Sequence, residues 1–369
     1  MRYAIILLAA LLALIAACGG RGETVETPAL SRTVRAETQP PSAPAEQAPT
    51  DGTLAFTSCV DVDDEGHVSC DIYLVNADGS GFTRAVDGGR WPVWSPDGSR
   101  FVFLGEDEQV SVVNADGTGI VRLAESGDPI SPPAWSPDGT QIVFVRGQDN
   151  LGVVAADGSG QPTFFENPEF AYYFRPAWSP DGRRIVFEFV TNDPFDDELY
   201  LINPDGSDLT RLTDLDQGQD PRLPTWSPDG SRIAFTAEGD IYVVNADGTG
   251  LTNLTSGPGE DNYPVWSPDG ARIAFSASSS SCEPFCAVSV VNSDGSGQTD
   301  IADIPDDGYW PAWSPGGASI AFASCDKVDE ETSTCAVYVV NTDGSGLTRI
   351  AEAPAGEQVL TVAWSPAAQ

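Results

Sequence analysis

A tripeptide, Trp-Ser-Pro, recurs seven times in this chain of 369 residues and constrains its fold more than any other feature. Successive copies are separated by 40 to 51 residues. A second signature, usually Asn-x-Asp-Gly followed by Ser or Thr and Gly, also occurs seven times and alternates with the first. Repetition at this period is typical of solenoids and propellers, so we expect one repetitive domain rather than several unrelated ones.

Four short apolar runs fall within each period, as residues 241–244, 251–254, 264–267 and 272–275 show. Runs rich in β-branched and aromatic residues, bounded by Gly, Pro, Asp and Asn, are typical of strands. Four strands in about 40–50 residues is the length of one propeller blade. The sequence therefore predicts an all-β protein, a seven-bladed β-propeller with four-stranded antiparallel blades.

The two chain ends are incomplete repeats that complement each other. Residues 51–58 match a repeat that lacks its Trp strand, and residues 359–366 are a Trp strand without the remainder of its repeat. Pairing the N- and C-terminal strands in one blade would remove the open edge of the ring. Both signatures suit a type I turn followed by Gly with a positive φ, and we expect each Trp to pack between blades.

The repeat resembles a known family. The segments from Trp226 to Phe235 and from Trp266 to Phe275 are similar to the WD-like repeats of TolB-type propellers, and the resemblance covers residues 51–366. It implies the propeller fold and says little about function. The chain departs from the family's type member by its seven blades rather than six and by an N-terminal lipid-attachment signal.

That signal occupies residues 1–17, where Arg2 precedes an apolar run too short to span a bilayer comfortably. The run ends at Cys18, in a pattern that resembles the bacterial lipobox, so we expect Cys18 to be lipidated after cleavage. An ordinary secretory signal with an incidental Cys is the alternative. Residues 18–50, rich in Pro, Ala, Glu and Thr, are predicted to be a disordered tether, and residues 51–369 the propeller. The protein would be lipid-anchored to a bacterial membrane and face the periplasm or the cell exterior.

Six further cysteines agree with an oxidising compartment. They form three pairs that are close in sequence, and each pair lies between two strand-like runs. We expect the disulfides Cys59–Cys70, Cys282–Cys286 and Cys325–Cys335, each stapling a hairpin loop. Metal ligation is the alternative, but a thiolate pair without a nearby His is a poor zinc site.

Charge and composition exclude several functions. The net charge of −37 repels phosphate backbones, so we expect no nucleic-acid partner. The single His, His67, excludes a site with several His ligands. An acidic loop begins like a calcium loop but has Ile72 at the twelfth position, where a bidentate Glu is required. We expect no cofactor, with calcium as the alternative at Asp61, Asp63 and Glu65.

A partner is expected on the face that carries loops of variable length, because variable loops on a rigid scaffold are where binding usually occurs. Residues just before each Trp strand should surround the mouth of the central channel on that face. The candidate ligand-binding residues are Arg90, Trp91, Phe174, Arg175, Arg222, Tyr263, Tyr309 and Trp310. They could form an aromatic and Arg pocket for a carboxylate-bearing glycan, a peptide or an anchor side chain of a protein. Alternatively, the aromatic residues cap the channel and the Arg residues neutralise nearby Asp.

We expect a non-catalytic binding or scaffold module of the cell envelope, a monomer with no catalytic residue assigned. Its partner would be an envelope protein or a cell-wall glycan, and its lipid anchor would engage the membrane. The alternative is a carbohydrate-active enzyme, a glycoside hydrolase or lyase, that uses carboxylates of the loop face.

Overall fold

The computed structural model describes residues 52–60, 69–127, 131–147, 149–166, 172–191, 197–216, 218–257, 259–279, 282–303, 309–327 and 333–366. Several sequence predictions lie outside the described residues: the signal peptide, Cys18, the tether, His67, Asp61, Asp63 and Glu65, and the side chains of Cys282, Cys286 and Tyr309.

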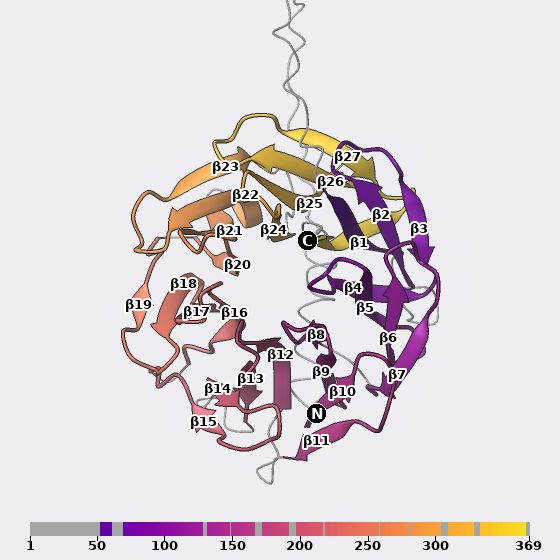
Figure 1. The fold of residues 1–369 in the computed structure, drawn as a ribbon. Helices are drawn as coiled ribbons and strands as arrows, with labels where there is room; N and C mark the ends of the chain where they lie inside the picture. The colour runs from indigo at the N-terminus through magenta and orange to yellow at the C-terminus, as the bar shows by residue number, and fades with distance from the viewer. Residues whose placement is uncertain are drawn as a thin grey trace, which may run out of the picture. The chain divides into compact units, whose positions relative to one another are not determined.

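The described residues form seven four-stranded antiparallel sheets, which are the blades of a propeller (Figure 1). From the channel outward, blade 1 consists of β28 (Glu357–Trp364), β1 (Thr53–Val60), β2 (Cys70–Asn76) and β3 (Thr83–Val86). Blade 2 consists of β4 (Gly89–Trp94), β5 (Arg100–Gly105), β6 (Gln109–Asn114) and β7 (Val121–Glu125). Blade 3 consists of β8 (Ala134–Trp135), β9 (Gln141–Arg146), β10 (Asn150–Ala155) and β11 (Thr163–Glu166). Blade 4 consists of β12 (Tyr172–Trp178), β13 (Ile185–Val190), β14 (Glu198–Ile202) and β15 (Thr210–Arg211).

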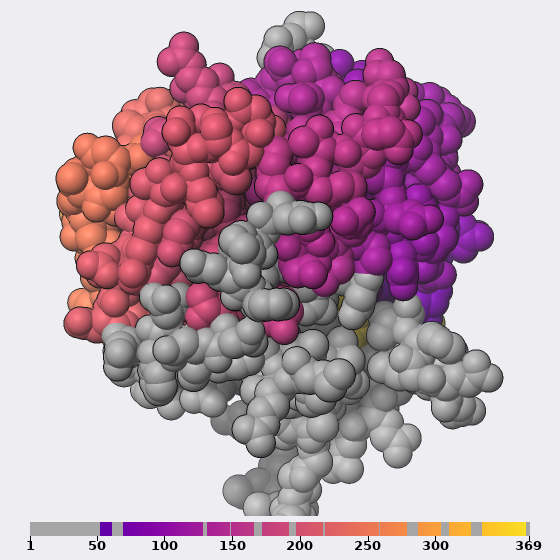
Figure 2. All heavy atoms as spheres, turned by 90° about the horizontal axis from the view of Figure 1, so that it is seen from below, coloured from indigo at the N-terminus to yellow at the C-terminus, as the bar shows by residue number. Residues whose placement is uncertain are grey.

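Blades 5 to 7 repeat this order. Blade 5 consists of β16 (Arg222–Trp226), β17 (Arg232–Ala237), β18 (Asp240–Asn245) and β19 (Thr252–Asn253). Blade 6 consists of β20 (Asp261–Trp266), β21 (Arg272–Ser279), β22 (Cys282–Asn292) and β23 (Thr299–Asp303). Blade 7 consists of β24 (Tyr309–Trp313), β25 (Ser319–Lys327), β26 (Ser333–Asn341) and β27 (Thr348–Glu352). Seen from the rim, successive blades lie side by side (Figure 2).

The ring closes as the sequence predicts. The last strand, β28, pairs with the first, β1, in an antiparallel register that matches Leu54 with Trp364 and Val60 with Glu357. Blade 1 therefore takes its inner strand from the C-terminus and its other three strands from the N-terminus (Figure 1). The predictions of an all-β class, seven blades and closure in one blade are confirmed.

The predicted turns are also confirmed, and blade 5 shows how their residues form them. The amide of Gly230 donates to the Ser227 carbonyl at 2.9 Å, and Gly230 has a φ of 69°, which favours glycine. The Ser227 hydroxyl and the Ser231 amide donate to the Asp229 carboxylate at 2.7 and 3.0 Å. These donors lower the pKa of Asp229 to about 2, so the carboxylate that organises the turn stays ionised.

The hydrophobic core is divided among the blade interfaces. Seven clusters of buried apolar side chains are present among the described residues, one between each pair of neighbouring blades. Five of the repeated Trp side chains donate their indole N–H to a carbonyl of the preceding blade, at 2.9 to 3.2 Å: Trp94, Trp135, Trp226, Trp266 and Trp313. The Trp residues therefore pack between blades, as predicted.

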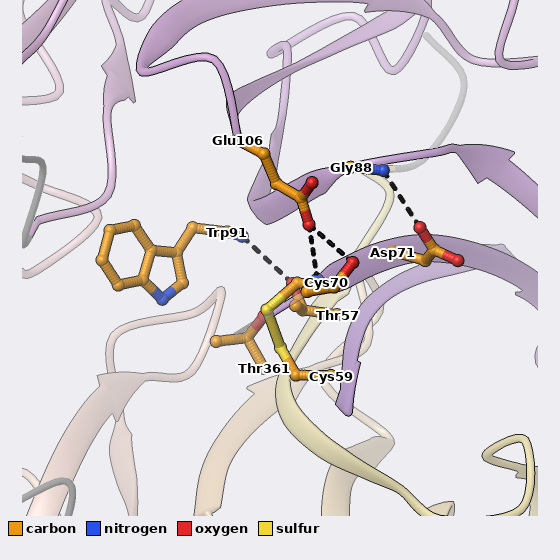
Figure 3. The surroundings of a disulfide bond; sticks show 9 residues. Thr57, Cys59, Cys70, Asp71, Gly88, Trp91, Glu106 and Thr361 are labelled. Carbon is orange, nitrogen blue, oxygen red and sulfur yellow. Dashed lines mark hydrogen bonds between the residues drawn. A yellow bond between two sulfur atoms is a disulfide. The ribbon is translucent and has the colours of Figure 1, made fainter. Parts of the chain in front are cut away.

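Two predicted disulfides, Cys59–Cys70 and Cys325–Cys335, are present. In each, the two cysteines are direct partners across neighbouring strands, β1 with β2 and β25 with β26. Each bridge therefore closes a hairpin, as predicted, and joins its two strands directly, as Cys59–Cys70 shows (Figure 3). Strand pairing extends further along these hairpins than the apolar runs indicate.

Candidate functional site

The inner strands begin at the face where the sequence places a partner, and we call this ring of strand starts the mouth. Six of the seven inner strands carry the motif x-Pro-x-Trp there. In five of them the residue before Pro has a φ between 48° and 60°: Trp91, Arg175, Leu223, Tyr263 and Trp310. Each of these five strands has a β-bulge at the same place. Positive φ in a bulky residue costs of order 1–3 kcal/mol and clusters at functional sites, so the mouth carries strain at the same repeat position in five blades.

Hydrogen bonds from neighbouring blades fix three of these bulges. The Trp91 amide donates to the Thr57 hydroxyl at 3.0 Å. The Arg175 amide donates to the Ser131 hydroxyl at 2.6 Å, and the Leu223 amide donates to the carboxylate of Glu188 at 2.6 Å. In each case the acceptor belongs to the preceding blade. Contacts between blades thus support the strained residues, so the backbone conformation of the mouth depends on the assembled ring.

Blades 1 and 3 depart from this pattern. Blade 3 has Pro132 at the bulge position, and the pyrrolidine ring cannot adopt a positive φ. Its inner strand, β8, is only Ala134–Trp135. Blade 1 has the smaller Thr361, which is buried and donates to the Thr57 hydroxyl at 2.9 Å. The large side chains of the mouth therefore come from blades 2, 4, 5, 6 and 7.

The structure brings three of the predicted residues into one cluster. The Arg175 guanidinium of blade 4 lies 5.3 Å from the centre of the Trp310 indole of blade 7. That indole in turn stacks on Tyr263 of blade 6, with ring centres 5.1 Å apart. Because blades 4 and 7 are not neighbours in the ring, the Arg175–Trp310 contact crosses the channel. We call Arg175, Tyr263 and Trp310 the mouth cluster.

The other predicted residues lie apart from it. Arg90 and Trp91 form a separate pair in blade 2, with the guanidinium 4.9 Å from the ring centre. The Arg222 side chain is 57% exposed and forms an ion pair with Asp220 at 3.3 Å. Phe174 is 7% exposed, so it packs inside blade 4 and offers little surface to a ligand. The side chain of Tyr309 lies outside the described residues.

Sequence reasoning missed the carboxylate behind the mouth cluster. Glu188 lies in the middle of β13, its side chain is 7% exposed, and its Oε1 is 3.6 Å from Nε of Arg175. Burial raises the pKa of Glu188, and Arg175, the Leu223 amide and Arg222 partly oppose that rise. Leu223, the bulge residue of blade 5, was also missed. The signal for Glu188 was a charged residue inside an apolar strand, and the signal for Leu223 was the x-Pro-x-Trp motif.

Two observations bear on ligands elsewhere in the molecule. The described residues contain no group of three His, Cys, Asp or Glu side chains placed to hold a metal ion. A hollow of about 380 Å³ lies between the outer parts of blades 4 and 5, lined in part by Arg211 and Leu251. Arg211 is bound there by Glu198 at 2.5 Å and Asp214 at 3.0 Å. The Arg211 guanidinium in the lining of this hollow is thus already paired with two carboxylates of the protein.

Comparisons with solved structures show the same fold. An oligogalacturonate lyase from Vibrio parahaemolyticus superimposes with a TM-score of 0.62 at 15% identity, over 80% of this chain and 92% of that one. TolB from Acinetobacter baumannii gives a TM-score of 0.53 at 18% identity, over 85% and 83% of the two chains. A puromycin hydrolase gives 0.61 at 16% identity, over 84% of this chain and 55% of that one.

Sequence comparisons are more specific about descent. A search of curated proteins finds no match to this sequence. The family model described as the TolB beta propeller domain matches residues 105–367, which is well over half of the chain. With seven blades built from the repeat that this family model describes, the protein belongs to the TolB β-propeller domain family.

Proposed function

We propose that this protein is a non-catalytic binding module of the bacterial cell envelope that takes an envelope protein or a cell-wall glycan at its mouth. One observation carries the proposal: five bulky residues at the same position of the inner strands are held at positive φ, and three of them form the mouth cluster. Strain of this kind persists only where the surrounding structure enforces it, and it is common at ligand sites. Aromatic and Arg side chains are also the residue types that dominate binding energy at interfaces.

Three features support a location outside the cytoplasm. Two disulfides suit an oxidising compartment, and a structural neighbour is a TolB. The lipobox-like sequence ending at Cys18 supports a lipid anchor at the mature N-terminus. Within the part of the chain that the structure describes, no helix has the length and apolarity needed to span a bilayer.

A carbohydrate-active enzyme is the alternative function, and Glu188 is the observation that favours it. Its buried carboxylate lies beside the mouth and has a raised pKa, as a general acid requires. Hydrolysis of a glycosidic bond uses a pair of carboxylates, so Glu188 would need a second partner. Turnover of an acidic oligosaccharide by the wild type, lost in Glu188→Gln, would favour this alternative over the binding module.

The binding proposal is tested by crosslinking in intact cells followed by capture of the tagged protein. We expect one envelope component that is lost in the triple variant Arg90→Ala, Arg175→Ala, Arg222→Ala. A matched control removes the same charge from exposed positions away from the mouth, with Arg122→Ala, Arg183→Ala and Arg349→Ala, and should retain the component. Equal capture by both triple variants would contradict a site at the mouth.

Anchoring is tested separately. We expect Cys18→Ala to move the protein from the membrane fraction to the soluble fraction, because the acyl chains attach to that Sγ. A folded but soluble variant that still captures its partner would show that the anchor and the mouth act independently. Membrane association that persists in Cys18→Ala would contradict the lipid anchor.

A further inference from the structure

Glu188 is a buried charge in the channel wall whose presence the fold itself does not explain. It follows the core Phe of its strand, and the corresponding residue in the other blades is uncharged: Thr57, Leu104, Val145, Thr236, Ser276 and Ala323. Burying a carboxylate costs several kcal/mol unless it is paired. A charge at this position in one blade of seven therefore needs a reason particular to blade 4.

Support of the neighbouring bulge is not that reason. Glu188 accepts the Leu223 amide at 2.6 Å, but in blade 1 Thr57 accepts the equivalent Trp91 amide at 3.0 Å with a neutral hydroxyl. Blade 1 therefore shows that a neutral hydroxyl is enough to hold this backbone position, so the bulge does not require a charge. What the carboxylate adds is the ion pair with Arg175, at 3.6 Å and largely shielded from water.

Arg175 is held from two sides. Glu188 pairs with its Nε, and the guanidinium lies over Trp310 on the other side of the channel. A ligand carboxylate at the mouth would seek this same cation. Because Glu188 already neutralises the single positive charge of this guanidinium and would repel a second carboxylate beside it, Glu188 and such a ligand compete for Arg175.

We propose that the Glu188–Arg175 ion pair is a latch that holds the Arg175 guanidinium over Trp310, and that a carboxylate-bearing ligand binds by taking Arg175 from Glu188. This inference rests on the proposed function, which it deepens by naming the chemistry of the ligand and the residue that limits its affinity. Glu188 is a positioning residue, since it acts on the ligand through Arg175. Tyr263, stacked on Trp310, supports the indole on which the guanidinium lies.

Because of the latch, the affinity of the mouth for a carboxylate ligand should depend on pH. The charged groups that face Glu188 are Arg175 on β12 and Arg222 on β16, while its register partners Phe174 and Leu199 are apolar. Protonation of Glu188 removes the competitor and leaves Arg175 charged. Affinity for a carboxylate should therefore rise as pH falls through the raised pKa of Glu188, as long as the ligand stays ionised.

The first experiment needs no ligand and tests the latch alone. The arginine Nε–H resonance of Arg175 is followed by NMR in the full-length protein between pH 7.5 and pH 5, and is assigned by its loss in Arg175→Gln. We expect it to titrate in the wild type and to be independent of pH in Glu188→Gln and in Glu188→Thr. The Thr variant reproduces the Thr57 arrangement, so it keeps an acceptor for Leu223 without the charge. Identical titration in the wild type and both variants would overturn the latch.

The second experiment measures binding of two probes, trigalacturonate and a peptide ending in two Asp residues, by calorimetry at pH 7.5 and pH 5.5. For a probe that binds, we expect affinity to rise about tenfold on acidification in the wild type, a change of about 1.4 kcal/mol. Glu188→Gln should bind more tightly than the wild type at pH 7.5 and show no such dependence on pH, and Arg175→Gln should lose binding. Binding that is equal in Glu188→Gln and the wild type at both pH values would overturn the competition.

The two experiments separate the latch from the proposed function. If the Arg175 Nε–H resonance shifts with pH as expected but neither probe binds any variant, Glu188 still holds Arg175, and the assignment of a carboxylate ligand is overturned. If only trigalacturonate or only the peptide binds with the expected dependence on pH, the competition is supported and the source of the carboxylate is identified.

Discussion

Two parts of the ring join their blades by different means. At four interfaces an Arg six residues after the Trp of one blade lies over the Trp of the next blade, 4.8 to 5.3 Å from the ring centre: Arg100 on Trp135, Arg184 on Trp226, Arg232 on Trp266 and Arg272 on Trp313. We call these interfaces, 2–3, 4–5, 5–6 and 6–7, the clamped arc. Each of these Arg residues also donates to a backbone carbonyl further along, as Arg232 does to Ser293 at 2.9 Å.

The interfaces 7–1 and 1–2, which we call the closure arc, have no such Arg. Ser319 stands at its position in blade 7, and Thr53 stands at its position in blade 1. Here blade 1 is completed by pairing of β28 with β1, and blades 1 and 7 each contain a disulfide within the blade. Contacts where blade 1 meets blade 2 include the bonds from the Cys70 amide to Glu106 and from the Gly88 amide to Asp71, each at 3.0 Å (Figure 3). The comparison teaches that the repeat uses a side-chain clamp between blades where the chain runs on, whereas the blade in which the two chain ends meet is held by strand pairing and a disulfide within it.

Breaking the closure arc should have the largest effect. Deletion of residues 359–369 removes most of β28, so blade 1 loses its inner strand and β1 acquires an open edge. We expect loss of cooperative thermal unfolding, followed by circular dichroism. A chain that ends at Pro366 keeps the whole of β28 and serves as the control. Unchanged thermal unfolding after the longer deletion would contradict closure by strand pairing.

Removal of one disulfide of the closure arc should have the next largest effect. The double variant Cys325→Ala, Cys335→Ala opens a loop with a sequence separation of 10, which should lower the free energy of unfolding by about 3 kcal/mol. Denaturant titration measures the loss. Dithiothreitol should then destabilise the wild type more than this variant, and equal sensitivity to the reductant would show that the bridge contributes little.

The clamped arc contains a group that destabilises the folded protein at neutral pH. This group is the carboxylate of Asp261, which is 7% exposed at the start of β20. Burial, reinforced by Asp240 and Asp300, raises the pKa of Asp261 to about 6. In blade 1 the equivalent outer-strand position is Arg84, which pairs with Asp71 at 3.0 Å, whereas blade 6 has Asp300 there. At this outer-strand position the clamped arc thus has an anion near a buried carboxylate, where the closure arc has a cation paired with the half-buried Asp71.

This difference predicts how stability depends on pH. Because the folded-state pKa of Asp261 lies above its ordinary value of 3.8, its contribution is fully present below that value and is lost as pH rises to about 6. Asp261→Asn should therefore raise the free energy of unfolding at pH 7.5 by up to about 3 kcal/mol and leave it almost unchanged at pH 3.5. Denaturant titrations at both pH values check this, and a variant less stable at pH 7.5 would contradict it.

The sequence predicted the ring because its determinants are local and repeated. Seven Trp strands, turns closed by Asp-Gly, and complementary half-repeats at the two ends fix the blade count and the closure. The pairs Cys59–Cys70 and Cys325–Cys335 followed from the same spacing, although strand pairing extends beyond the predicted loops.

The mouth was predicted only in part because its contacts depend on the closed ring. Arg175 meets Trp310 across the channel, at a sequence separation that no local pattern encodes. Glu188 lies in a strand that is otherwise buried and apolar, so the alternation that marks half-buried strands gave no sign of it. Phe174 was predicted from its place just before a Trp strand, but in the structure it is only 7% exposed and offers little surface to a ligand.

Transfer of the clamp should have the smallest effect and gives the most direct test of the comparison. The 3–4 interface lies outside both arcs: it has Gln141 at the clamp position, and the buried indole N–H of Trp178 has no hydrogen-bond partner. Gln141→Arg should place a guanidinium over Trp178 and raise the free energy of unfolding by about 0.5–1 kcal/mol, the usual range of an exposed cation–π contact.

Arg232→Gln makes the reverse change over Trp266. It should lower the free energy of unfolding by slightly more than Gln141→Arg raises it, because it also loses the bond to the Ser293 carbonyl. If the clamp is an independent device of each interface, the two effects add in the double variant, since the 3–4 and 5–6 interfaces share no residue. A gain from Gln141→Arg that disappears when Arg232 is replaced would instead show that strain is shared around the ring, and the division into two arcs would then be wrong.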